Sequence, residues 1–243
     1  MRHIGPVFKR EFLGYFRSPV AYVFLIAFLV ISIAWSFSKF AAGGIFKAGI
    51  ASMDRYFEAF PWLFLFLVPA VGMRLWSEEK RSGTVELLFT LPVTTVEAVF
   101  AKFFAGWAFL SLAVLLSFPL AITIGYLGNP DWGVVTASYI GAILMAGAYL
   151  GICALMSALT KNQVIAFVLS IGVCVIFVFL GYSGFSETLE SVFPVGVADA
   201  VANFSFGTHF NAFLMGVIDL KDVVFFLSLI GLTMFLNVVA LER

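Results

Sequence analysis

The sequence predicts an all-α, polytopic membrane protein with six transmembrane helices, and two observations support this prediction. The first is composition: 62% of the 243 residues are hydrophobic, 12% are charged and the mean hydropathy is +1.07. A soluble domain of this size could not bury so much apolar surface in one core. The second is pattern: charged residues lie in short clusters between long apolar runs, five of which reach the roughly 20 residues that a spanning helix needs. The net charge of zero gives no indication of a nucleic-acid partner.

One membrane domain, residues 1–243, accounts for the whole chain. Its expected spans occupy residues 18–40, 56–76, 95–127, 132–159, 162–183 and 220–241. The second span lies in a short apolar run between Glu58 and Arg74. It can cross the bilayer if Arg74 extends toward the headgroups and residues 53–58 lie in the outer interface. Pro69 in this span and Pro119 in the next each remove a backbone hydrogen bond, so we expect a static kink at each.

Lysine and arginine residues indicate that both termini lie in the cytoplasm, because cytoplasmic segments carry an excess of them. With both termini inside, ten of the 14 basic residues are cytoplasmic and four are outside. The ten are Arg2, Lys9, Arg10, Arg17, Arg74, Lys80, Arg81, Lys102, Lys161 and Arg243, and the four are Lys39, Lys47, Arg55 and Lys221. The densest charge cluster, residues 74–97, is therefore expected to be a cytoplasmic connector.

The N-terminal segment 6–17 predicts an amphipathic helix in the inner membrane interface. At 100° per residue, one face carries Phe8, Phe12, Tyr15 and Phe16, and the opposite face carries Arg10, Gly14 and Arg17. Two other interpretations are a loose basic anchor that only sets topology and a cleaved signal peptide. The apolar run that follows is too long for a typical signal core, which disfavours the latter. Ser18 and Pro19 suit the N-cap and the first turn of the first span.

Two patterns predict how the spanning helices begin and pack. Thr94 and Glu97 match a capping box at the start of the third span, which gives Glu97 a structural role. Gly147 and Gly151 lie about one turn apart in the fourth span and form part of a ridge of small residues. Such a ridge allows close helix approach, so we expect a packing seam there.

The region 187–218 contains enough uncharged residues for a seventh span, but its many polar residues make it too polar to face lipid on all sides. We expect short helices that enter the outer leaflet only partway, sheltered by the bundle. His209 lies in this region, and a hydrogen-bonded structural histidine is a more common arrangement than a ligand or a proton relay. Asp219 is expected to cap the last span, with Asp222 in its first turn.

The connector 77–92 divides into two pieces. Residues 77–82 continue the second helix into water, and Gly83 ends it. Residues 84–89 then predict a short helix, which Pro92 terminates. Because so short a helix is not stable alone, it needs a surface to dock on. Either it rests on the membrane interface as a re-entry turn, or it docks on a cytoplasmic partner with its charges fixing the register.

Several function classes are disfavoured by what the sequence lacks. It contains no Gly-x-x-x-x-Gly-Lys-Ser/Thr nucleotide-binding loop, no Ser/His/Asp arrangement and no metal-ligand pattern. We therefore expect no catalytic site, no metal and no cofactor in this chain. An ion-coupled secondary transporter needs ionisable groups at mid-membrane, and the predicted spans supply almost none.

The connector sequence RLWSEEKRSGTVELLFTLPV, residues 74–93, closely resembles that of type-2 ABC transporter permeases, the exporter class of the type V fold. The resemblance is strongest to the gliding-motility-type branch. Further matching stretches are Lys9–Phe12, Ser18–Pro19, Leu159–Gln163, Gly216–Val223 and Leu241–Arg243. They extend over nearly the whole chain, and their order and spacing make the short motifs specific.

The resemblance implies a complex rather than a single protein. Such permeases have six spans, an N-terminal elbow helix, a cytoplasmic coupling helix and re-entrant helices before the last span. Two permease subunits, identical or different, pair with two ATPase subunits that hold ATP and Mg²⁺. An accessory subunit with a large extracytoplasmic domain can join them. The implied location is the bacterial inner membrane, with both termini cytoplasmic.

The same resemblance assigns roles to residues of this chain. The group expected to face the ATPase comprises Glu78, Glu79, Lys80, Arg81, Gly83, Thr84, Glu86 and Leu88, and the elbow helix carries Phe8, Lys9, Arg10, Phe12, Phe16 and Arg17. The implied function is an exporter permease that couples ATP hydrolysis by the partner to substrate movement. The alternatives are an ABC-coupled complex for mechanotransmission or anchoring and, less favoured, the ion-coupled secondary transporter.

Overall fold

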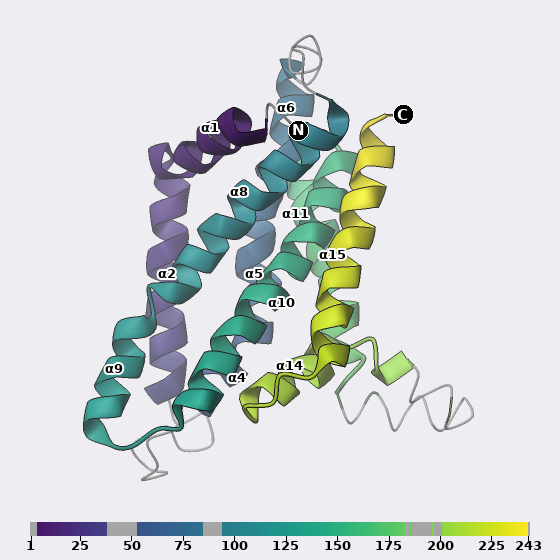
Figure 1. Cartoon of the computed structure of the whole chain (residues 1–243). Helices are drawn as coiled ribbons and strands as arrows, with labels where there is room; N and C mark the ends of the chain where they lie inside the picture. Colours follow the sequence, from purple (N-terminus) through teal and green to yellow (C-terminus); the bar gives the residue numbers. More distant parts are fainter. Residues whose placement is uncertain are drawn as a thin grey trace.

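The computed structural model describes residues 4–37, 53–84, 94–182, 185, 196 and 201–242, and all regular elements in these ranges are helices. They are α1 (Ile4–Arg17), α2 (Pro19–Phe37), α4 (Asp54–Glu58), α5 (Phe60–Gly72), α6 (Arg74–Ser82), α8 (Thr95–Leu115), α9 (Phe118–Leu127), α10 (Trp132–Leu159), α11 (Gln163–Phe179), α14 (Phe206–Leu214) and α15 (Leu220–Leu241). Figure 1 shows the long helices side by side in a bundle, with α1 lying across one end.

Five helical stretches in the described ranges are long and apolar enough to cross a membrane: Pro19–Phe37, Phe60–Ser82, Thr95–Leu127, Trp132–Leu159 and Leu220–Leu241. The chain is therefore a multi-pass, all-helical membrane protein. The remaining expected span, 162–183, corresponds to α11, an apolar helix of 17 residues that is shorter than the other five. That residues 162–183 span the membrane remains a prediction.

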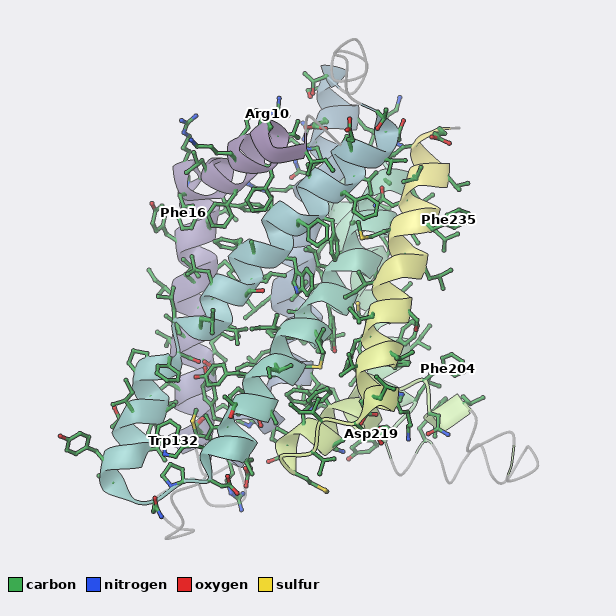
Figure 2. All side chains as sticks on the ribbon, viewed as in Figure 1. Arg10, Phe16, Trp132, Phe204, Asp219 and Phe235 are labelled. Atoms are coloured by element: carbon green, nitrogen blue, oxygen red, sulfur yellow. The ribbon has the colours of Figure 1, made fainter. Side chains whose placement is uncertain are left out.

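Helix α10 lies at the centre of the bundle and contacts α5, α6, α8, α11, α14 and α15. In an apolar stretch of 18 residues within α10, 72% of the residues are buried. In the corresponding stretches of α2 and α15, which lie at the periphery, 28% are buried. Exposed apolar side chains such as Phe235 project from the peripheral helices, as Figure 2 shows. A helix bundle with an apolar exterior is suited to a lipid surrounding.

Glycines on α10 allow its neighbours to approach closely. A Cβ at Gly147 would lie 2.9 Å from both Ile230 Cδ1 of α15 and Trp107 Cε2 of α8. A Cβ at Gly151 would collide with the Thr233 hydroxyl and lie 3.3 Å from Thr233 Cβ. The two glycines therefore lie where α10 meets α15 and α8, and they leave no room for a larger side chain.

Several helices begin or end at the residues that the sequence predicts. Thr94 and Glu97 form the predicted capping box, and the Lys221 backbone N–H donates to Asp219 Oδ1 at 3.2 Å. Gly83 ends α6 with a φ of +70°, a left-handed conformation that favours glycine. The third expected span is interrupted between α8 and α9, just before Pro119, where the Ser117 hydroxyl donates to the Val114 carbonyl at 2.7 Å.

The region before the last helix contains α14, whose nine residues give a length of about 14 Å, too short to span. It lies across the end of the bundle opposite α1 (Figure 1). His209 on α14 is buried, with Nδ1 2.6 Å from Asp222 Oδ1 and Nε2 2.7 Å from the Asn203 carbonyl oxygen. The ring is thus hydrogen-bonded on both sides and ties α14 to α15.

Candidate functional site

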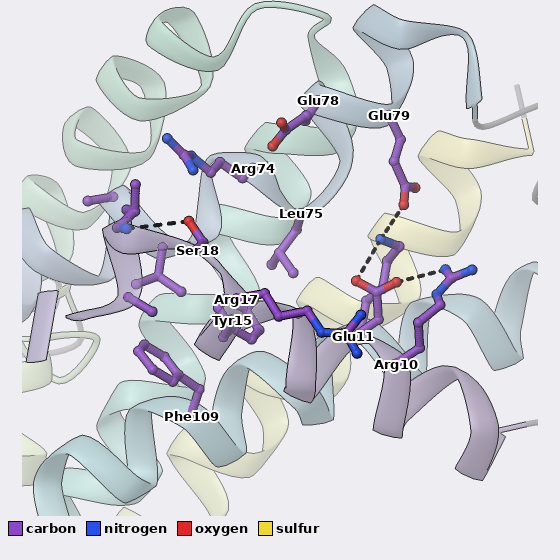
Figure 3. A pocket seen from close by; sticks show the side chains of 16 residues that line it. Arg10, Glu11, Tyr15, Arg17, Ser18, Arg74, Leu75, Glu78, Glu79 and Phe109 are labelled. Carbon is purple, nitrogen blue, oxygen red and sulfur yellow. Dashed lines mark hydrogen bonds and ion pairs between the residues drawn. The ribbon is translucent and has the colours of Figure 1, made fainter. Parts of the chain in front are cut away.

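Four charged side chains from three helices meet at the end of the bundle where α1 lies and where α6 projects. Lys102 of α8 is only 3% exposed, and its Nζ lies 2.7 Å from Glu79 Oε1 of α6 and 3.4 Å from Glu11 Oε2 of α1. Arg10 Nη2 lies 2.8 Å from Glu11 Oε1. Figure 3 shows these contacts as dashed lines. We call Arg10, Glu11, Glu79 and Lys102 the charged junction.

Burial explains why Lys102 has two acidic partners. An ammonium group removed from water loses several kcal/mol of hydration unless nearby charges replace it. Two carboxylates provide this compensation, and the Trp76 ring, 5.1 Å from Nζ, adds a cation–π contact. Burial alone would raise the pKa of the Glu11 carboxyl, but Lys102 and Arg10 outweigh it, so the pKa of Glu11 lies below its usual value.

Helix α6 is also joined to the central helix α10. The Ser157 hydroxyl accepts hydrogen bonds from the backbone N–H groups of Trp76, at 3.1 Å, and Ser77, at 3.0 Å, and donates to the Met73 carbonyl at 2.7 Å. Lys80 Nζ donates to the Ala158 carbonyl. These contacts lie where α5 passes into α6, and they fix α6 to α10.

The amphipathic helix α1 packs its aromatic face on α8. Tyr15 stacks on Phe109 with ring centroids 4.9 Å apart, and Phe16 meets the same ring edge-on at 5.9 Å. Phe8 stacks on Phe12, and Lys9, Arg10 and Arg17 are exposed. Much of the face that the sequence suggested for the membrane interface therefore contacts protein, which makes α1 a strap across the bundle end.

The residues predicted to face an ATPase do not share one environment. Glu78, Arg81, Gly83 and Thr84 are exposed at the projecting end of α6. Glu79 and Lys80 are half-buried and contact the bundle instead, through Lys102 and Ala158. Glu86 and Leu88 lie outside the described residues. The structure thus divides the predicted group into an outward-facing part and an anchoring part.

In the sequence alone, Lys102 stands out only as a topology marker and Glu11 only as part of a motif, and neither Trp76 nor Ser157 stands out at all. One signal for Lys102 was present: it is a lone cation at the edge of a 28-residue charge-free run, where a lysine needs a partner. Nothing in the local pattern identifies its partners, because Glu11 and Glu79 lie 91 and 23 residues away.

No group of three His, Cys, Asp or Glu side chains that could hold a metal ion occurs among the described residues. What the site offers is a mechanical connection among α1, α6, α8 and α10 beside an exposed helix end.

A scan against protein-family models matches residues 7–181 to a family described as "ABC-2 family transporter protein". A comparison with curated proteins finds no match.

Proposed function

Since the chain belongs to the ABC-2 family of transporter proteins, we propose that it is the membrane-spanning permease subunit of an ATP-driven exporter. The observation that carries the proposal is the projecting end of α6, with its outward-facing charges and its inward anchoring to α8 and α10. A segment that only reversed the chain direction at the membrane surface would not need to be fixed in place. Here the buried Lys102 ammonium group and the Ser157 hydroxyl both hold α6 in position.

In this proposal the partner is a cytoplasmic ATPase dimer that holds ATP and Mg²⁺, and it contacts Glu78, Arg81, Gly83 and Thr84. Residues 85–92 complete the coupling segment. Glu79 and Lys80 then transmit movement of α6 into the bundle. A second permease subunit completes the transport path, which runs along the interface between the two permeases. The connector's resemblance favours the gliding-motility-type branch, in which an accessory subunit can take part.

The topology proposed for this function has six spans, of which α11 is the fifth along the chain. Hydrogen bonds from Leu180 N to the Ile176 carbonyl and from Tyr182 N to the Phe179 carbonyl, at 3.0 and 2.9 Å, continue the chain in helical turns to Tyr182. Residues 163–182 then reach about 30 Å, the thickness of the hydrocarbon core.

Charge supports the proposed orientation in the bacterial inner membrane. Figure 1 shows the two termini and the projecting end of α6 at the same end of the bundle. Of the ten lysines and arginines in the described ranges, eight lie toward this end (Lys9, Arg10, Arg17, Arg74, Lys80, Arg81, Lys102 and Lys161), while Arg55 and Lys221 lie toward the other. By the positive-inside rule, this distribution favours a cytoplasmic location for the end that carries the eight basic residues.

The test of the ATPase contact is charge reversal at the exposed end of α6. The tagged chain is isolated from its native membranes in mild detergent, and co-isolated polypeptides are photolabelled with azido-ATP. We expect Glu78→Lys with Arg81→Glu to reduce recovery of the labelled polypeptide at least about tenfold, since several charged contacts are reversed. Lys221→Glu, at the opposite end, is the matched control and should recover it normally. Equal recovery from both variants, or no labelled polypeptide with the unaltered chain, would refute the assignment.

A further inference from the structure

A cavity of about 460 Å³ lies beside the charged junction, between α1 and the helices α2, α5, α6 and α8. Figure 3 shows its lining side chains. Its size falls within the range of about 300–1,000 Å³ that is usual for small-molecule sites. The ATPase contact proposed above shares only Glu78 with this lining, because Arg81, Gly83 and Thr84 lie outside it.

Two arginines in the lining have no ion-pair partner among the described residues. Arg17 ends α1 and Arg74 begins α6, and neither forms one of the salt bridges found there. The Nε of Arg74 is buried and has no hydrogen-bond partner. A buried guanidinium N–H without an acceptor is costly, so this position favours a ligand that supplies an oxygen.

The charge of the lining also favours an anion. Four cations line the cavity, Arg10, Arg17, Arg74 and Lys102, against three acids, Glu11, Glu78 and Glu79. Within the junction, Lys102 and Arg10 already neutralise Glu11 and Glu79. One singly charged anion would balance the lining as a whole, and the two arginines left without partners are its natural contacts.

Apart from Gly14, Tyr15 and Ser18, the rest of the lining is apolar and comes from the spanning helices of the bundle. Val20 and Ala21 of α2, Ala70 and Val71 of α5, Leu75 of α6 and Phe109 of α8 form this part. A free phosphate ion would gain nothing from such a surface. An amphipathic molecule would place its anion on the arginines and its acyl chains on the apolar side chains.

We propose that this cavity binds a phospholipid of the cytoplasmic leaflet, with the phosphodiester oxygens on Arg17 and Arg74. Phosphate oxygens accept hydrogen bonds from guanidinium groups in a bidentate geometry, and the buried Arg74 Nε gains the acceptor that it lacks. The bound lipid fills the space between the strap α1 and the bundle. This site depends on the membrane orientation of the chain and not on the ATPase contact, so either proposal can fail alone.

The test is lipid retention measured by native mass spectrometry of the detergent-purified protein titrated with phosphatidylglycerol. The unaltered chain should retain one phosphatidylglycerol, and Arg17→Gln with Arg74→Gln should weaken its binding about tenfold or more, since two charged hydrogen bonds are lost. Arg81→Gln is the matched control, because it removes an exposed arginine from the same helix outside the cavity lining. Its binding should stay within about twofold of the unaltered protein.

Two further arms separate the possible sources of binding. Diacylglycerol, which has the acyl chains without the phosphate, should bind about tenfold more weakly than phosphatidylglycerol. Millimolar inorganic phosphate should fail to displace the lipid. Equal retention by the double variant, equal binding of diacylglycerol or displacement by inorganic phosphate would each overturn the proposal. Arg17→Gln alone, at an exposed position, provides the same comparison if the double variant unfolds.

Discussion

Lys102 is the residue that holds together the end of the bundle at which α1 lies. Its ammonium group is the only cation within hydrogen-bonding distance of both Glu11 and Glu79 among the described residues. It therefore links α1 to α6 through α8. Its removal would leave two carboxylates close together and without their shared partner, and such uncompensated charge is far more costly than the loss of an exposed pair.

We predict that Lys102→Met lowers the free energy of unfolding by about 3–5 kcal/mol, the usual cost of breaking a buried ion pair. Thermal unfolding of the detergent-purified protein, followed by tryptophan fluorescence, measures the effect. Lys161→Met removes an exposed lysine at the same end of the bundle and should change the stability by less than about 0.5 kcal/mol. Similar effects from both substitutions would contradict the role given to Lys102.

Glu11 makes the same contact sensitive to acid. Because its pKa in the folded protein lies below the usual 4.5, the ionised carboxyl stabilises the fold above pH 4.5, and this contribution disappears as pH falls through the lower folded value. We expect the unfolding temperature to drop more steeply below pH 4.5 in the unaltered protein than in Glu11→Gln. Parallel pH profiles for the two proteins would show that Glu11 contributes nothing.

At the scale of the elements, local sequence rules were sufficient for helix ends and insufficient for helix partners. The capping box of Thr94 and Glu97, the Asp219 cap and the break at Gly83 follow from side-chain chemistry within a few residues, and all three are present. The packing of α1 on α8 could not be foreseen in this way. An aromatic helix face fits lipid and protein equally well, and only the tertiary structure places Phe109 beside Tyr15.

The α10–α15 contact gives a prediction for an element. Gly151→Val should destabilise the bundle by about 1–3 kcal/mol or more, because the added side chain must displace Thr233 or separate the two helices. The unfolding temperature measures it. Gly172→Val in α11, where a Cβ meets nothing within 4 Å, adds the same side chain without a clash and is the control. A tolerated Gly151→Val would mean that α10 and α15 do not pack this closely.

At the scale of the whole molecule, composition and charge spacing predicted the class of the protein. The family match agrees with it, as do the five helical stretches of the described residues that are long and apolar enough to cross a membrane. The same information could not predict how the connector is anchored. Glu79 and Lys80 look like their neighbours Glu78 and Arg81 in a charge cluster, yet two face the bundle and two face outward. Which of four adjacent charges face the bundle depends on the position of α6 against α8 and α10, and no local pattern encodes it.

The central claim is that nucleotide-driven movement at α6 reaches α1 through the charged junction. The most direct test measures whether the two ends of the bundle move relative to each other when nucleotide binds. Spin labels at Leu13 of α1 and Tyr126 of α9, both exposed and toward opposite ends of the bundle, report it in the proposed complex with an ATPase. We predict that ATP with vanadate shifts the distance distribution between the two labels. Glu79→Gln should abolish the shift, because it removes the charge pair between α6 and Lys102 while Lys102 keeps its contact with Glu11. The ATPase should stay bound to this variant. An unchanged distribution in the unaltered complex, or a full shift in Glu79→Gln, would contradict it.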